Sequence, residues 1–202
     1  MSRREVSPER LQFFSDGVFA VLITILVLEL HAPAEGHWSS LAELWPEAAS
    51  YAVSYLFIAI VWVNHHHLLS YAERATPRLI WANFAHLFTV SLLPFTTSWL
   101  ARTRLDGIPV CAYAGVFALV NASYIVLCNE LLDRPVILSP ASRRLMRMRS
   151  LLTLTAFIAA SLLALWHPLL GFGLICGCLL TYLRPETGGL ATTDTDAAAP
   201  AD

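Results

Sequence analysis

Ionisable and amide side chains are few in this sequence, and several of them lie inside apolar stretches where they need an explanation. Asp16 and Glu29 lie at opposite ends of the first apolar stretch, and Asn64 precedes the run His65–His67 in the second. A charged group in hydrocarbon is costly, so each one is expected to have a partner or a function. The chemistry open to such residues is proton relay, hydrogen bonding between helices, or metal binding.

The run His65–His67 has poor spacing for a metal site. Zinc ligands from one helix are usually spaced i, i+4, so that both point the same way. Three consecutive residues instead fan out over roughly 200° of a helix. The carboxylates of Asp16, Glu29 and Glu130 also lack helix spacing to a histidine. We therefore expect no metal site, and we favour hydrogen bonds from the histidines to neighbouring helices.

Sequence motifs for catalysis are missing. There is no recognisable Ser-His-Asp context, no H-E-x-x-H and no phosphate-cradling glycine loop, so we expect neither enzyme activity nor a cofactor. A T-V-G-Y-G carbonyl filter is also missing, so any ion selection must come from something else. The net charge of −2 provides no basic surface for nucleic acid.

Composition indicates what must position the polar residues. Hydrophobic residues make up 56% of the 202 residues and charged ones 14%, against about 25% charged residues in a typical soluble domain. Such a deficit indicates lipid as the solvent, and at about 20 residues per span the chain has room for five to seven membrane helices. We predict an all-α integral membrane protein.

Six apolar stretches predict six transmembrane helices. The predicted spans are Phe13–Leu30, Ala48–Tyr71, Leu79–Ala101, Ile108–Leu132, Leu145–Trp166 and Leu169–Leu183. His167 and Pro168 divide the last two, because proline cannot continue a helix. The expected organisation is an N-terminal segment over 1–12, a membrane domain over 13–184 and a disordered tail over 185–202.

The arginines predict the orientation of the spans. The N-terminus, the second-to-third loop, the fourth-to-fifth loop and the tail hold 3, 2, 5 and 1 of them, or 11 on one side, against Arg102 and Arg104 on the other. Because cytoplasmic loops are enriched in arginine, both termini are expected in the cytoplasm. An even number of spans also requires that both termini lie on the same side of the membrane.

The first predicted span has one uniform face. Val21, Thr24, Ile25 and Leu28 follow i, i+3, i+4, i+7 spacing and cover roughly 10 Å of helix axis. This face is apolar except for one hydroxyl. The pattern alone is typical of a stripe that faces lipid or packs on a neighbouring helix.

A signature at the start of that span resembles a known family. Arg10, Phe14, Ser15, Asp16 and Gly17 form R-x-x-x-F-S-D-G. Further matching residues are Trp62, Asn64, His65 and His66 (W-x-N-H-H), Trp81 with Asn83, and Pro94 with Phe95. The sequence is similar to the bacterial branch of the endosomal and lysosomal potassium channel family, over about the first 100 residues.

The resemblance implies a fold and a function. Single-repeat bacterial members assemble as homotetramers with six helices per subunit, and the first helix of each subunit lines a central pore. Selection and gating are attributed to rings of side chains on that helix, which correspond here to Val21, Thr24, Ile25 and Leu28. At the narrow position Val21 stands where isoleucine or leucine is frequent, and its shorter side chain would widen the constriction or change the selectivity.

The expected function is therefore a potassium-selective cation channel in the cell membrane, with potassium ions as its ligand and no cofactor. Glu29 would lie near the outer mouth and concentrate cations there. A polar network of Arg10, Ser15, Asp16, Trp62, His65, His66, Trp81 and Asn83 would hold the first three helices together at their cytoplasmic ends, with Asp16 paired to Arg10 or a histidine. The alternative function is a proton-coupled transporter that uses Asp16 and the histidines.

Overall fold

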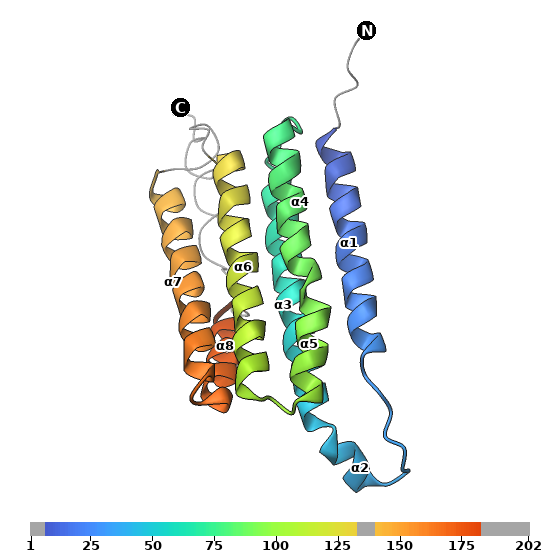
Figure 1. The fold of residues 1–202 in the computed structure, drawn as a ribbon. Helices are drawn as coiled ribbons and strands as arrows, with labels where there is room; N and C mark the ends of the chain where they lie inside the picture. The colour runs from blue at the N-terminus through green and yellow to red at the C-terminus, as the bar shows by residue number, and fades with distance from the viewer. Residues whose placement is uncertain (1–6, 133–139, 183–202) are drawn as a thin grey trace, which may run out of the picture.

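The computed structural model is a bundle of α-helices, and it describes the backbone of residues 7–132 and 140–182. Figure 1 shows α1 at one edge of the bundle and α7 at the other, with α3, α4, α5 and α6 between them. The helices are α1 (Pro8–Leu28), α2 (Trp38–Glu43), α3 (Trp45–Leu69), α4 (Pro77–Ser91), α5 (Leu93–Arg102), α6 (Gly107–Leu132), α7 (Pro140–Ala164) and α8 (Pro168–Tyr182).

Helix α1 begins earlier than the predicted first span. The side chain of Ser7 accepts a hydrogen bond from the backbone N–H of Arg10 at 3.4 Å, and Pro8 occupies the first helical turn. Both are favourable at a helix start, because the cap satisfies an orphan amide and proline lacks one. The helix therefore starts at Pro8 instead of Phe13, and it ends at Leu28 instead of Leu30.

The third predicted span, Leu79–Ala101, is present, but its helix is interrupted at Leu92 and so divided into α4 and α5. Pro94 lies in the first turn of α5. Proline has no backbone N–H for the carbonyl one turn earlier, so the hydrogen-bond ladder is interrupted there. The two helices together still form one apolar run of 26 residues, Pro77–Arg102.

The short helix α2 lies between the first two spans, outside any predicted element. Figure 1 shows it beyond the end of the bundle, connected directly to the start of α3. Trp38 and Leu41 on this helix are both exposed. Six residues cannot cross a membrane, so this segment is an extramembrane element of the loop after α1.

The predicted interruption at His167 and Pro168 is present, since α7 ends at Ala164 and α8 starts at Pro168. Within the described residues, five helical runs are long and apolar enough to cross a membrane, and Pro168–Thr181 is a shorter apolar helix. The 15 residues of α8 extend about 22 Å, less than the roughly 30 Å of a hydrocarbon core. A sixth span is therefore a proposal.

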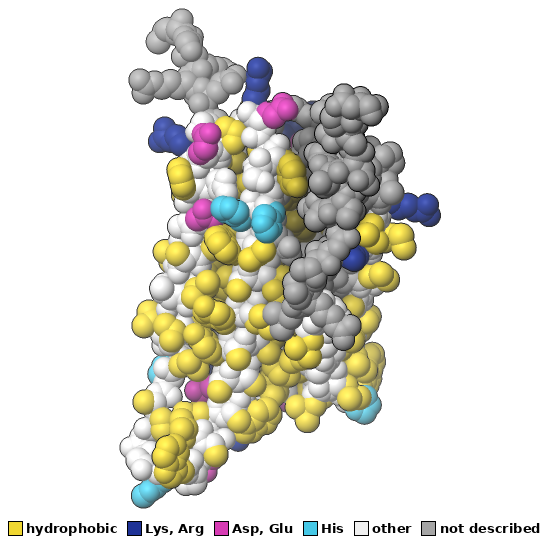
Figure 2. Space-filling model, turned by 180° about the vertical axis from the view of Figure 1, so that it is seen from behind, with side chains coloured by type: hydrophobic (Ala, Val, Ile, Leu, Met, Phe, Trp, Pro, Cys, Tyr) yellow, Lys and Arg dark blue, Asp and Glu magenta, His cyan; other side chains and the backbone are white. Residues whose placement is uncertain are grey.

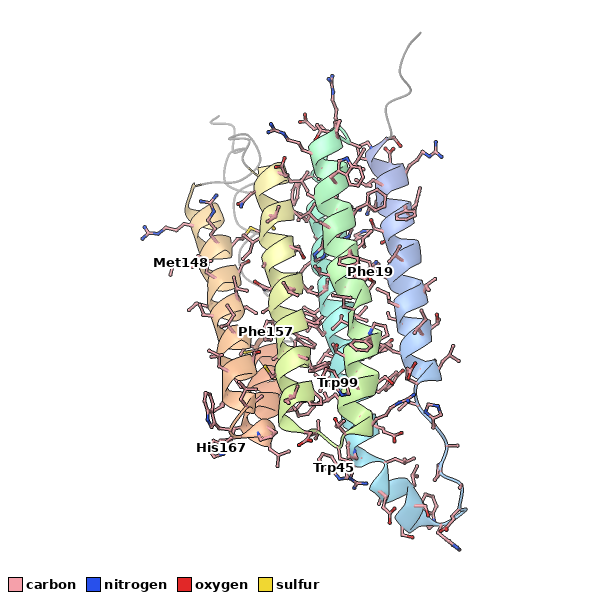
Figure 3. The ribbon with its side chains drawn as sticks, in the orientation of Figure 1. Phe19, Trp45, Trp99, Met148, Phe157 and His167 are labelled. Atoms are coloured by element: carbon pink, nitrogen blue, oxygen red, sulfur yellow. The ribbon has the colours of Figure 1, made fainter. Side chains whose placement is uncertain are left out.

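Aromatic side chains join α3, α6 and α7 in the core. Phe57 stacks on Phe117 with ring centroids 3.7 Å apart, and Phe157 meets Phe117 edge-on at 5.3 Å. Figure 3 shows Phe157 between α7 and α6. Offset and edge-on aromatic pairs stabilise beyond their buried area. This cluster fixes the α3–α6–α7 side of the bundle independently of α1.

Several residues used for the orientation and domain predictions lie outside the described residues. They are Arg3, Arg4, Arg134, Arg184 and the tail over 185–202.

Candidate functional site

Helix α1 has a buried face that repeats every three or four residues. The residues on it are Leu11, Ser15, Phe19, Leu22 and Leu26. They face α3, α4 and α5, and Figure 3 shows Phe19 directed into the bundle. Four of the five are large apolar side chains, so burial in the core explains their spacing. Ser15 is the exception, and its partners are described below.

The four predicted pore residues lie together on a different face, and all four are exposed in the single subunit. Val21 is 55% exposed and Leu28 76%, with Thr24 and Ile25 also on the surface. The hydroxyl of Thr24 donates to the backbone carbonyl of Val21 at 2.7 Å. Its oxygen lone pairs remain available for a further interaction on this face. The face therefore needs a covering of lipid or of other subunits.

Asp16 pairs with α3. The indole Nε1 of Trp62 donates to Oδ1 of Asp16 at 2.8 Å, and Nδ1 of His66 lies 4.0 Å from the same oxygen. Asp16 was predicted to pair with Arg10 or with a histidine, and the structure places the histidine His66 beside it. The guanidinium of Arg10 is exposed and makes no ion pair within the part of the chain that the structure describes.

Gln12 joins this cluster, and sequence reasoning missed it. Its Nε2 lies 2.9 Å from Nδ1 of His66. Gln12 precedes Asp16 by four residues, so both side chains project from the same side of α1 toward His66. That i, i+4 spacing was the available signal.

A buried hydrogen-bonded chain links α3, α4 and α1. Nε2 of His65 lies 2.7 Å from Oδ1 of Asn83, and Nδ2 of Asn83 donates to Oγ of Ser15 at 3.0 Å. The Ser15 hydroxyl then donates to the carbonyl of Leu11 at 2.9 Å. His65, Asn83 and Ser15 are all fully buried. These bonds favour one packing of three helices, because a shift would strand the buried groups that they join. The other ring nitrogen of His65, Nδ1, is buried without a hydrogen-bond partner among the described residues.

A second branch extends the chain to α6. The rings of His65 and His86 stack with centroids 5.6 Å apart, and Nδ1 of His86 lies 2.9 Å from Oγ of Ser123. Thr89 contacts the same Ser123 oxygen at 2.9 Å. The network therefore reaches from α1 across α3 and α4 to α6.

Two residues predicted for the network, Arg10 and Trp81, contribute no side-chain hydrogen bond or ion pair to it among the described residues. Trp81 is 73% exposed and its ring contacts Phe84, and Phe84 in turn meets Phe14 of α1. His67 is also exposed, while His65 is buried, so the consecutive histidines diverge as helix geometry requires. No group of three potential metal ligands comes together among the described residues.

Glu29 lies at the opposite end of α1 from Asp16. Its Oε2 accepts a hydrogen bond from the Ser98 hydroxyl at 2.7 Å and lies 4.0 Å from the guanidinium of Arg102. These contacts attach the end of α1 to α5. The three contacting residues, Glu29, Ser98 and Arg102, line a small cleft together with Glu47, Tyr51 and Thr97. The carboxylate is thus partly neutralised by Arg102, although it stays accessible to solvent.

The surface and the helices define a class of protein. Figure 2 shows hydrophobic side chains over the middle of one face, with charged and histidine side chains toward its two ends. Together with the five long apolar helices, this distribution defines a multi-pass membrane protein. Four of its buried polar residues lie on α1, the end of α3 and α4 (Ser15, His65, Asn83 and His86), and four lie on the first half of α3 and on α5 (Ser50, Ser54, Thr96 and Thr97).

Comparison with known proteins finds a family match over part of the chain. Residues 10–94 match the family model described as the endosomal/lysosomal potassium channel TMEM175. The matched region contains most of α1 and all of α3 and α4.

Individual relatives agree with the family match. A protein of Chryseobacterium sp. strain P1-3 named a potassium channel is 38% identical over 124 residues, 61% of this chain and 64% of the relative. A crystal structure described as a lysosomal potassium-selective channel TMEM175 homolog from Chamaesiphon minutus superposes with a TM-score of 0.77 at 26% identity, covering 87% of this chain and 95% of that one. A more distant relative from Gallus gallus, 28% identical over 68% of this chain and 31% of its own length, is named an endosomal/lysosomal proton channel.

The curated bacterial relatives are matched over only part of their length. The alignments span between 56% and 64% of those relatives.

Proposed function

We propose that this chain is the subunit of a potassium-selective cation channel, and not an enzyme. The observation that carries the proposal is the division of α1 into two faces. One face is held in the bundle by a buried hydrogen-bonded chain, and the other presents Val21, Thr24, Ile25 and Leu28 outward with no covering from its own subunit. The names of the bacterial relative and of the solved homologue support potassium as the permeant ion.

In the proposed assembly four copies place this face of α1 around a common axis. Rings of Val21, Ile25 and Leu28 would constrict the pore with apolar side chains, and such a constriction opens and closes by wetting and dewetting. Four Thr24 oxygens would supply ligands to a partly dehydrated cation. An apolar ring has a weak field, so we expect modest discrimination of potassium over sodium.

The proposed topology has six spans with both termini in the cytoplasm of the cell. The shorter helix α8 would complete the sixth span, and the bias of 11 arginines against 2 sets the orientation. Asp16, Trp62 and His65 would then lie in the cytoplasmic half of the bundle, and Glu29 near the outer mouth. The polar network would set the tilt of the pore helix.

The test is a measurement of reversal potential in planar bilayers under a potassium/sodium gradient. The matched variants are Val21→Ala and Val27→Ala, the same chemical change on two faces of one helix. Val27 is 47% exposed and lies outside the proposed pore face. Val21→Ala should change conductance or selectivity, whereas Val27→Ala should not. Equal currents in both variants and in the wild type would reject the assignment of the pore face.

The same recordings separate the rival function of a proton-coupled transporter. A channel conducts in proportion to the driving force and without saturation, with a reversal potential that follows the potassium gradient. A current that saturates and reverses with the proton gradient would instead favour transport through Asp16 and the histidines. Asp16 already accepts a hydrogen bond from Trp62 and lies beside His66, which is the arrangement of a structural carboxylate.

A further inference from the structure

The first turns of α7 differ from every other part of the bundle. This helix carries Arg143, Arg144, Arg147 and Arg149 and has no acidic residue along its 25 residues. Side chains 144–149 are all exposed. The proposed pore does not require these arginines, since α1 and α7 lie at opposite edges of the bundle (Figure 1).

Arg144 and Arg147 have the spacing of a two-pronged site. Residues three apart on a helix lie on the same face, with Cβ atoms roughly 5–6 Å apart. The guanidinium of Arg147 donates to Oδ1 of Asn129 on α6 at 3.3 Å, which orients it and leaves further N–H donors unused. Neither guanidinium pairs with a carboxylate among the described residues. Two adjacent guanidinium groups of this kind match the geometry of a phosphate.

The surroundings of the pair point to lipid. Along an 18-residue apolar stretch of α7, within Arg144–Ala164, only 11% of the residues are buried, whereas 28–44% are buried in the corresponding stretches of the other four long helices. Its 21 residues extend about 31 Å, so a span of this length places Arg144 and Arg147 at the level of the headgroups.

Apolar side chains directly below the pair support the same partner. Met148, Leu151 and Leu152 are exposed, and Figure 3 shows Met148 on the outer side of α7. Arginines at the end of an apolar span lie at the level of the lipid headgroups, and exposed apolar side chains below them face the acyl chains. A second protein subunit is a weaker candidate for this surface, because the exposed face of α1 is on the far side of the bundle.

We propose that Arg144 and Arg147 bind the phosphate of an anionic phospholipid of the phosphatidylglycerol type. The guanidinium groups clamp the headgroup, and the acyl chains lie along Met148, Leu151 and Leu152. The site depends on the bilayer and on α7, and it does not require that the protein conduct potassium.

The test uses the purified full chain in detergent, titrated with phosphatidylglycerol or phosphatidylcholine. Native mass spectrometry counts bound lipids, and the melting temperature is followed in parallel. Both lipids carry a phosphate, but only phosphatidylglycerol has a net negative charge. The wild type should retain phosphatidylglycerol preferentially and be stabilised by it. From the usual contribution of a surface arginine, we expect the double variant Arg144→Gln/Arg147→Gln to retain phosphatidylglycerol at least roughly tenfold less than the wild type does.

The matched control is Arg102→Gln/Arg104→Gln, which removes the same charge at the opposite end of the bundle. It should keep the wild-type preference for phosphatidylglycerol. Equal retention by wild type and the α7 variant would overturn the proposal, and so would an equal loss in the control. Stabilisation by inorganic phosphate alone, to the same extent as by the lipid, would overturn it in favour of a site for soluble anions.

The single variants Arg144→Gln and Arg147→Gln keep the proposal testable if the double variant does not fold. Each should lower retention several-fold, and unchanged retention in both would overturn the site. Potassium currents decide nothing here, so failure of the channel proposal and failure of the lipid site are distinguishable.

Discussion

The indole N–H of Trp62 donates a 2.8 Å hydrogen bond to Asp16, joining α3 to the start of the motif on α1. The carboxylate is only partly shielded, and His66 lies 4.0 Å from the same oxygen. A charge-assisted hydrogen bond is worth more than a neutral one, and losing it leaves the carboxylate poorly compensated. This contact is therefore the most direct place to test the polar network.

Asp16→Ala and Trp62→Phe should each destabilise the assembled protein by about 1–3 kcal/mol, because each removes one partner of this bond. In detergent we expect a lower melting temperature and, for Asp16→Ala, reduced tetramer yield or altered gating. Trp81→Phe is the matched control, since Trp81 is exposed and outside the network. Wild-type yield and conductance in Asp16→Ala would remove the structural role assigned to this carboxylate.

The substitution Asn83→Ala should lower the free energy of unfolding by more than a typical substitution at the surface does. It removes both the acceptor for His65 and the donor to Ser15 in a fully buried site. Losing the Asn83 acceptor strands the buried His65 nitrogen at a cost of about 1–3 kcal/mol. Ser15 loses one accepted hydrogen bond but still donates to the carbonyl of Leu11. The comparison is Asn129→Ala, whose exposed side chain accepts a hydrogen bond from Arg147. Thermal unfolding of both variants checks the prediction, which fails if their melting temperatures agree.

Gly171→Ala should loosen the contact between α7 and α8. A Cβ at Gly171 would lie 2.8 Å from both the Ala160 carbonyl and the Ala164 Cβ, so the helices must separate. At Gly177 on the same helix nothing lies within 4 Å of such a Cβ. Because alanine is the better helix former by roughly 1 kcal/mol, Gly177→Ala should be neutral or stabilising. Opposite shifts in melting temperature are expected, and equal shifts would contradict the close approach.

Arg102→Gln should raise cation current at low ionic strength. The change leaves the Glu29 carboxylate with its Ser98 hydrogen bond but without the nearby positive charge. The uncompensated charge would then concentrate cations at the outer mouth. Glu29→Gln should lower the current under the same conditions. Both effects should shrink at 1 M salt, where the Debye length is about 3 Å. Salt-independent changes would instead indicate altered packing of α1 on α5.

Much of the fold was predictable from local pattern. Charge depletion indicated membrane helices, and Pro168 marked the interruption after α7 correctly, because each signal depends on nearby residues alone. The start of α1 was missed, since the Ser7–Pro8 cap lies in a polar segment that hydropathy ignores. The break at Leu92 depends on Pro94, whose effect on a helix ranges from a kink to a division according to its neighbours.

Helix periodicity is enough to place Val21, Thr24, Ile25 and Leu28 on one face of a membrane helix, because that periodicity depends on nearby residues alone. The packing of the bundle leaves this face uncovered and buries Ser15, on the opposing face, against Asn83. It also separated Trp62, which reaches Asp16, from Trp81, which does not. Which polar residues meet depends on how α1, α3 and α4 rotate against one another, and no single helix contains that information.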